Sequence, residues 1–240
     1  MRELYFCGDA PKFETTDTFA KGGTITAYYP ADRKTWDRSN LVSHGAERID
    51  WKTWTVPLNH FSTVIKSVTP VSKGLEVKWN KMGNATGYLI ERSIGNGKYE
   101  KVKTITSGNT ISWTDTSVKN GHRYTYRIYG TNGTNISKVS PAKYRYYLSK
   151  NTLTSLSKSG KTFTAKWKSN SSATGYQIQY AKNSKFTGAK TVKVSSRKIL
   201  SKKVSPNFRG KCYVRVRTYK TVNKTNFYSV WSNVRSISLS

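Results

Sequence analysis

Carboxylate side chains are scarce in this sequence, and residues 149–240 have none. The 240 residues include 42 Lys and Arg but only 12 Asp and Glu, and the last acidic side chain is Asp115. Residues 149–240 carry 20 basic side chains, so their net charge is +20, against +10 for residues 63–148 and 0 for residues 1–62. Glycoside hydrolysis needs two carboxylates that flank the bond, so residues 149–240 cannot perform it alone.

Other groups that support catalysis or metal binding are also rare. Cys7 and Cys212 form no C-x-x-C pair, and His44, His60 and His122 stand at no metal-ligand spacing. No phosphate-binding glycine loop, nucleophile elbow or calcium loop occurs. We therefore expect no enzyme activity, no metal and no cofactor, and we expect the isolated histidines to lie on the surface.

Long apolar runs are absent as well. No stretch of about 18 apolar residues occurs, so we expect no transmembrane helix. The first residues, MRELYFCGDA, lack the basic and apolar regions of a signal peptide. The sequence is nevertheless 35% hydrophobic and 13% aromatic, which is enough for packed cores, and its frequent Thr, Tyr, Val and Ile favour strands.

An internal repeat is the clearest positive signal. The stretches ATGYLI (85–90) and ATGYQI (173–178) lie 88 residues apart, as do Trp79 and Trp167. Tyr124 matches Cys212 at the same offset, whereas Tyr99 and Ile105 match Phe186 and Val192 at offset 87, as a one-residue loop change would give. A repeat of this length indicates two copies of one domain.

Within each copy, apolar residues alternate with polar ones. Leu75, Val77 and Trp79 are separated by Glu76 and Lys78. Such alternation predicts half-buried strands, and short strands bounded by turn residues predict an antiparallel β-sandwich.

Both copies resemble fibronectin type III domains. The resemblance rests on a Trp in the second strand, a Gly-Tyr that opens the third, and a Y-x-V-x-V type sixth strand; GYQIQYAKNSKF, YVRVRTYK and YSVWS resemble domains found in tandem on Gram-positive bacterial surface proteins. It implies an all-β chain with immunoglobulin-like sandwiches at residues 63–148 and 149–240. We assign structural roles to the repeat-matched or motif residues Trp79, Tyr88, Tyr124, Trp167, Tyr176, Cys212, Tyr228 and Trp231.

Two positions in the copies allow sharper expectations. Tyr124 occupies the tyrosine-corner position, where the hydroxyl bonds to nearby backbone, and Cys212 replaces it as a buried structural thiol. YSVWS resembles the W-S-x-W-S element of cytokine-receptor domains. Arg215 and Arg217 should point outward together and stack on Tyr228 and Trp231, which is either a structural ladder, a ligand-binding basic strand, or both.

Residues 1–62 differ in kind. They resemble the carboxyl-terminal end of BspA-like leucine-rich-repeat regions through a G-x-A-P turn at residues 8–11, Phe19, YYPA at residues 28–31, Thr35-Trp36, Gly45 and Trp51. We expect strands at LYF and Thr24–Tyr29 within a small solenoid cap. Because a terminal repeat cannot bury its inner face alone, we expect further repeats and a signal peptide upstream, in an extracellular or cell-surface protein.

Three functions fit these features. The first is a non-catalytic spacer and adhesion module of a bacterial surface or secreted protein, a monomeric rod that binds a protein or glycan partner. The second is binding of polyanions, with acidic wall polymers or glycans ahead of nucleic acid; the bland alternative is that the charge serves solubility. A third possibility is an accessory region of a secreted enzyme whose catalytic domain lies upstream. The candidate polyanion-binding residues are Lys202, Lys203, Arg209, Lys211, Arg215, Arg217 and Lys220.

Overall fold

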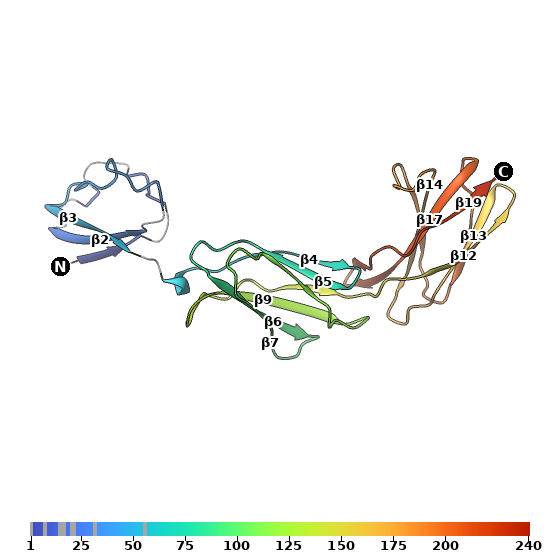
Figure 1. Cartoon of the computed structure of the whole chain (residues 1–240), viewed down its shortest axis with the longest axis horizontal. Coiled ribbons are helices and arrows are strands. Elements are labelled where there is room, and N and C mark those ends of the chain that lie inside the picture. Colours follow the sequence, from blue (N-terminus) through green and yellow to red (C-terminus); the bar gives the residue numbers. More distant parts are fainter. Residues whose placement is uncertain (1, 7–8, 14–17, 20–22, 31–32, 55–56) are drawn as a thin grey trace. The chain divides into compact units, whose positions relative to one another are not determined.

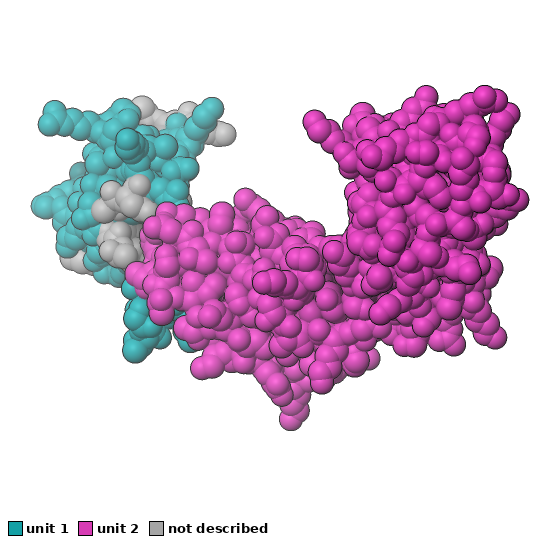
Figure 2. Space-filling model, turned by 45° about the vertical axis from the view of Figure 1, so that its right-hand side comes forward, with its two compact units in different colours: residues 1–62, 131–138 teal, residues 63–130, 139–240 magenta. Residues whose placement is uncertain are grey.

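The computed structural model describes the chain except for residues 1, 7–8, 14–17, 20–22, 31–32 and 55–56. It divides into two compact units, residues 1–62 with 131–138 and residues 63–130 with 139–240 (Figure 2). Nearly all regular structure is β-strand (Figure 1). The one helical turn among the described residues is η1 (Leu58–His60), and no described helix has the length and apolarity to cross a membrane.

The first unit contains a parallel sheet of β1 (Arg2–Tyr5), β2 (Thr24–Pro30) and β3 (Arg48–Trp54), in that order. Arg2 pairs with Ile25, and Thr24 pairs with Arg48, so successive strands return after 23 and 24 residues. β2 matches the predicted strand Thr24–Tyr29, β1 overlaps the predicted LYF strand at Leu4 and Tyr5 only, and the third strand was not predicted.

Aromatic side chains fill this unit. The buried Trp36 lies 4.8 Å from Phe6 and 5.7 Å from Trp51, between ring centroids. The surface location expected for His44 is wrong: it is buried, its ring stacks on Phe13 at 3.7 Å, and its Nε2 lies 2.8 Å from the Asn40 carbonyl oxygen. Gly8 and Ala31 of the expected repeat motif, and Cys7, lie outside the described residues.

The first sandwich packs a three-stranded sheet, β4-β5-β8, against a five-stranded sheet in which β10-β9-β6-β7 is extended by β11 on β9. The bounds are β4 (Ile65–Val71), β5 (Gly74–Trp79), β6 (Gly87–Ile94), β7 (Glu100–Ile105), β8 (Ser112–Asp115), β9 (Arg123–Asn132), β10 (Asn135–Ile136) and β11 (Lys143–Tyr146).

The second sandwich repeats this plan, with β12-β13-β16 packed against β15-β14-β17-β18 and β19 paired with β17. Its bounds are β12 (Leu153–Ser159), β13 (Thr162–Trp167), β14 (Gly175–Ala181), β15 (Lys190–Val194), β16 (Ser201–Val204), β17 (Gly210–Val222), β18 (Thr225–Tyr228) and β19 (Arg235–Leu239). The prediction of an all-β chain with two tandem immunoglobulin-like sandwiches is confirmed.

The repeated Gly-Tyr has the same role in both cores. Tyr88 and Tyr176 are fully buried, and each hydroxyl accepts a hydrogen bond from a backbone N–H six residues upstream, of Met82 and Asn170, at 3.0 Å. At Gly175 a β-carbon would lie 2.1 Å from the Val194 carbonyl oxygen, so no larger residue fits. The motif is therefore part of the scaffold.

The tyrosine corner exists in one copy. The Tyr124 hydroxyl accepts a hydrogen bond of 2.7 Å from the Lys119 backbone N–H. Cys212 is fully buried at the equivalent place, and burial raises the pKa of its thiol to about 11. A thiol held protonated is a poor nucleophile, which agrees with a packing role.

One expected match between the copies is wrong. Ile105 pairs with Tyr88, whereas the partner of Tyr176 is Val194, so Ile105 corresponds to Val194 and not to Val192. The connection between β14 and β15 is two residues longer than that between β6 and β7, since Tyr180 pairs with Lys190 and the equivalent Arg92 pairs with Glu100. A bulge between Ile90 and Glu91 offsets one of these two residues, and counting along the sequence cannot detect it.

Within the second unit, the two sandwiches are joined by a hydrogen-bonded junction. The amides of Asn120 and Asn170 bond each other reciprocally, at 3.0 and 3.1 Å, and the Asn120 Oδ1 also accepts from the Ser149 N–H at 3.0 Å. A β-carbon on Gly121 would lie 2.1 Å from the Ser172 hydroxyl oxygen. Close backbone approach thus accompanies the polar contacts.

Candidate functional site

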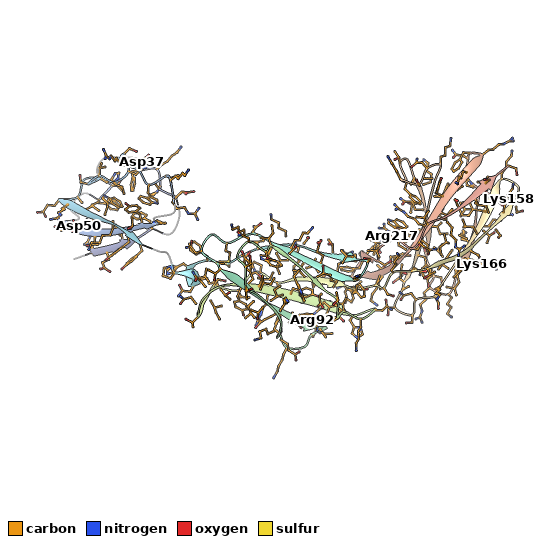
Figure 3. All side chains as sticks on the ribbon, viewed as in Figure 1. Asp37, Asp50, Arg92, Lys158, Lys166 and Arg217 are labelled. Atoms are coloured by element: carbon orange, nitrogen blue, oxygen red, sulfur yellow. The ribbon has the colours of Figure 1, made fainter. Side chains whose placement is uncertain are left out.

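The outer face of the five-stranded sheet in the second sandwich carries the most distinctive group of side chains. Along β17, Cys212, Val214 and Val216 point into the core and are fully buried. Arg215 and Arg217 alternate with them and therefore project from the opposite face, where Figure 3 labels Arg217.

Two guanidinium groups and three aromatic rings interleave on this face. The Arg215 Cζ lies 3.9 Å from the ring centroid of Phe186 and 4.6 Å from that of Trp231. The Arg217 Cζ lies 4.3 Å from the ring centroid of Trp231 and 4.0 Å from that of Tyr228. We call these five residues the arginine ladder; its stacking on Tyr228 and Trp231 follows the sequence expectation, and Phe186 is an addition.

Neutral acceptors hold both guanidinium groups. Gln179 is the direct cross-strand partner of Arg215, and its Oε1 accepts from Nε at 2.8 Å and also from Nη2. Gln177 is the partner of Arg217 and accepts from its Nε at 2.8 Å. The amides fix the planes of the guanidinium groups and leave both positive charges uncompensated.

A short segment after β18 places Trp231 in the ladder. The buried hydroxyls of Ser229 and Ser232 accept hydrogen bonds from the backbone N–H groups of Thr218 and Val216, at 3.0 and 2.9 Å. The backbone N–H groups of the two serines bond the carbonyls of the same two residues. These paired bonds fix the segment along β17 and direct Trp231 between the arginines.

Burial affects the charges of the ladder. Desolvation lowers the pKa of Arg215 and of Arg217 from the usual arginine range. For Arg217, the positive charges of Arg215 and Arg145 lower the pKa further. Loss of hydration without a compensating carboxylate is costly for a cation, so a bound anion would stabilise this face.

The structure distributes the other predicted polyanion-binding residues over several surfaces. Lys202 and Lys203 lie on β16, in the opposite sheet. Lys211 lies at the start of β17, with its ammonium 5.3 Å from the Tyr213 ring, and that of Lys220 lies 5.7 Å from the Tyr146 ring. The seven candidates therefore do not form one site.

Arg209 lies beside a pair of small hollows. One, of about 270 Å³, is lined by Arg209, Lys161 and Phe208, and the second, of about 250 Å³, shares Phe208 and adds Lys182. The Lys182 ammonium lies 5.4 Å from the Phe208 ring. Both hollows are below the ~300–1,000 Å³ typical of small-molecule sites.

The acids of the first sandwich mostly serve as ion-pair partners. Asp115 lies 2.6 Å from Arg92, Glu76 lies 3.0 Å from Lys78, and Glu91 contacts Arg127. Among the residues that the structure describes, no three His, Cys, Asp or Glu side chains gather where they could hold a metal ion.

Sequence reasoning missed several members of these clusters. Phe186 was matched to Tyr99 as a repeat position, and both prove to stack on an arginine: the Arg127 Cζ lies 4.1 Å from the Tyr99 centroid. Gln177 and Gln179 could have been found from their outward positions in the alternating strand, but their pairing with the arginines depends on the register of β14 and β17.

Among the comparisons with known proteins, the search of solved structures found similar chains, whereas the two sequence comparisons found none. No protein-family model matches the sequence, and no curated protein matches it. The FN1–FN3 domains of chicken CNTN1 are 21% identical, with a TM-score of 0.40, over 78% of this chain and 69% of that chain. A two-domain fibronectin type III segment of chicken tenascin is 15% identical, with a TM-score of 0.37, over 73% of this chain and 97% of that chain.

Proposed function

We propose that the chain is a non-catalytic spacer and interaction module in the carboxyl-terminal part of a bacterial cell-surface or secreted protein. Its domains would be a repeat-region cap at residues 1–62 and fibronectin type III domains at 63–148 and 149–240. The partner would be a protein or glycan surface, bound by a monomer. Support for a bacterial surface context comes from the sequence resemblance of both regions.

The junction between the sandwiches is the observation that carries the spacer role. Besides the Asn120–Asn170 amide pair, the Arg145 Nη2 donates to the Tyr228 carbonyl at 3.2 Å, and the rings of Tyr146 and Phe227 lie 5.0 Å apart. A linker that is bonded on several sides resists bending, as a spacer requires.

The parallel sheet of the first unit supports the proposed cap. Strand returns of 23 and 24 residues fall within the ~20–29-residue period of leucine-rich repeats. In such repeats each strand adds to a parallel sheet, as β1, β2 and β3 do.

Stiffness at the junction can be measured directly. With one spin label in each sandwich of the full chain, we expect a narrow distance distribution by pulsed electron paramagnetic resonance. The double variant Asn170→Ala, Phe227→Ala should broaden it, because it removes the amide pair and the ring contact. A matched control, Asn226→Ala, changes a neighbouring polar residue and should leave the distance distribution narrow. A broad distribution in the unaltered chain would refute the stiff spacer.

Polyanion binding by the second sandwich is a second candidate function. Its 20 cations have no carboxylate side chain within residues 149–240, so they attract counterions whose release favours a polyanion. Binding of a sulfated polysaccharide that weakens steeply with salt would support this function. Indifference to anionic polymers at about 150 mM salt would exclude it.

A further inference from the structure

One arginine is found at equivalent positions in the two sandwiches, but its side-chain hydrogen-bond acceptor differs between them. Arg127 and Arg215 lie 88 residues apart, and each stacks on an aromatic ring from the connection that follows the neighbouring strand: Tyr99 after β6, at 4.1 Å, and Phe186 after β14, at 3.9 Å. Arg127 Nε donates to the carboxylate of Glu91.

In the second sandwich the position of Glu91 is taken by Gln179, also 88 residues later. The Gln179 amide accepts from Arg215 in the same way. The geometry of the contact is kept while its negative charge is removed.

Arg217 is a second arginine whose hydrogen-bond acceptor carries no negative charge. It lies two residues further along β17, about 6–7 Å away along the strand, and Gln177 again supplies a neutral acceptor. All of residues 149–240 are described, and they contain no carboxylate side chain that could form an ion pair with either arginine. Two like charges are thus held side by side at a cost in repulsion that an anion would relieve.

We infer that the arginine ladder is an oxyanion-binding site that takes the sulfate or phosphate groups of an anionic carbohydrate polymer. This rests on the proposed polyanion binding and assigns it to one face. The Gln acceptors occupy the Nε edge of each guanidinium, and its remaining N–H groups lie in a fixed plane. That fork matches the oxygen pairs of sulfate and phosphate.

Occupied ring faces argue against nucleic acid as the ligand. Trp231 has a guanidinium group within 4.6 Å of its ring centroid from Arg215 and within 4.3 Å from Arg217. Single-stranded nucleic acid binding draws much of its affinity from base stacking on free aromatic faces. Here stacking partners are already supplied by the protein itself, so charge is what the ladder offers.

A pair of matched variants in the full chain separates the ladder from bulk charge. Gln179→Glu installs the acid that the first sandwich has, beside Arg215. Thr164→Glu installs the acid that the first sandwich has at Glu76. It lies on β13, in the other sheet from the ladder, and can pair with Lys166 of the same strand as Glu76 pairs with Lys78. Both lower the net charge by the same amount, and both copy arrangements that the fold already accommodates.

The probes are heparin and poly(glycerol phosphate), titrated by calorimetry at about 150 mM salt. We expect Gln179→Glu to weaken binding roughly tenfold or more, and Thr164→Glu to weaken it less than about twofold. Heparin against poly(glycerol phosphate) distinguishes sulfate from phosphate as the preferred group. Arg217→Lys keeps the charge but loses the planar fork, so it should also weaken binding severalfold.

The failures are distinguishable. Absence of binding by the unaltered chain would remove both the polyanion function and the ladder site. Equal weakening by the two Glu variants would leave polyanion binding in place and overturn the ladder site, as would an Arg217→Lys variant that binds normally. Tighter binding of a single-stranded oligonucleotide than of either heparin or poly(glycerol phosphate) would overturn the ligand class.

Discussion

In the first sandwich a buried ion pair links β6 and β8, whereas apolar side chains occupy the equivalent positions in the second. Asp115 is 1% exposed and accepts hydrogen bonds from Arg92 at 2.6 Å and from the Tyr126 hydroxyl at 2.8 Å. In the second copy, strand pairing aligns Val204 with Asp115, since their partners Phe163 and Leu75 are equivalent.

The other two members of this cluster change together with it. Tyr180 stands 88 residues after Arg92, and Val214 stands 88 residues after Tyr126; both are buried. One backbone plan therefore accommodates either the hydrogen-bonded cluster of Arg92, Asp115 and Tyr126 or the set Tyr180, Val204 and Val214. The second copy thus has a packed core without any carboxylate side chain.

Breaking the polar cluster should have the largest effect. Asp115→Ala removes the carboxylate that pairs with Arg92 and accepts from the buried Tyr126 hydroxyl. We therefore expect the free energy of unfolding of the first sandwich to fall by about 3–5 kcal/mol. Hydrogen–deuterium exchange with peptide resolution would locate the loss in β5, β6 and β9, while the second sandwich stays unchanged.

Full conversion to the second pattern is the control for that experiment. The triple variant Arg92→Tyr, Asp115→Val, Tyr126→Val copies the residues of the second sandwich. Replacing a whole buried ion pair by apolar groups is often close to neutral, so we expect a much smaller loss than in the single variant. A triple variant that is as unstable as Asp115→Ala would show that the two cores are not interchangeable.

Much of this architecture was predictable from local pattern. Leu75, Val77 and Trp79 are fully buried, as their alternation predicted, because side-chain direction in a strand follows from period two alone. The 88-residue repeat likewise predicted two copies of one fold. Such features depend on residues that are close together in the sequence.

Clusters that depend on register were not predictable. Arg92, Asp115 and Tyr126 come from three different strands, and nothing in their spacing indicates that they meet. His44 is buried, and the ring of Phe13, which is far earlier in the sequence, stacks on it. Its place in the sequence gave no indication of this contact. The Gln177 and Gln179 contacts also need the β14–β17 register, which a single bulge can shift.

Acidification should lower the stability of the first sandwich and leave that of the second unchanged. The expected loss is smaller than that caused by Asp115→Ala. Burial alone would raise the pKa of Asp115, but hydrogen bonds from Ser117, Arg92 and Tyr126 outweigh it and the pKa is lowered. A lowered pKa in the folded state stabilises the fold above the unfolded value near ~3.9, and this stability is lost as the pH falls through the folded value. The first sandwich should therefore weaken below about pH 4.

The second sandwich is the internal reference, because residues 149–240 contain no Asp, Glu or His. Its stability should stay level from pH 7 to pH 3, and amide signals in a ¹H–¹⁵N spectrum would report each sandwich separately. In the Asp115→Asn variant, the part of the stability loss at low pH that comes from protonation of Asp115 should disappear. Simultaneous acid unfolding of both sandwiches would contradict the assignment.

The smallest change in stability should come from Glu91→Gln, which gives the first sandwich the neutral acceptor that the second has at Gln179. The Glu91–Arg127 pair is partly exposed, with 19% and 32% of the side-chain surfaces open to solvent. Its removal should cost about 1 kcal/mol or less. The amide can still accept from Arg127, as Gln179 accepts from Arg215.

The same variant should free a charge. With Glu91 neutralised, Arg127 would stand on Tyr99 as Arg215 stands on Phe186, and the first sandwich should gain affinity for heparin. We expect the gain to be smaller than the loss caused by Gln179→Glu, because Arg127 has Val139 at the place of Trp231 and no second arginine two residues along. Both serines that set this place, Ser140 and Ser232, accept from the equivalent backbone N–H at 2.9 Å. The backbone arrangement at this place is therefore common to both copies. A gain in heparin affinity at Arg127 would show that a neutral acceptor, more than the stacked ring, makes such an arginine available to bind an anion.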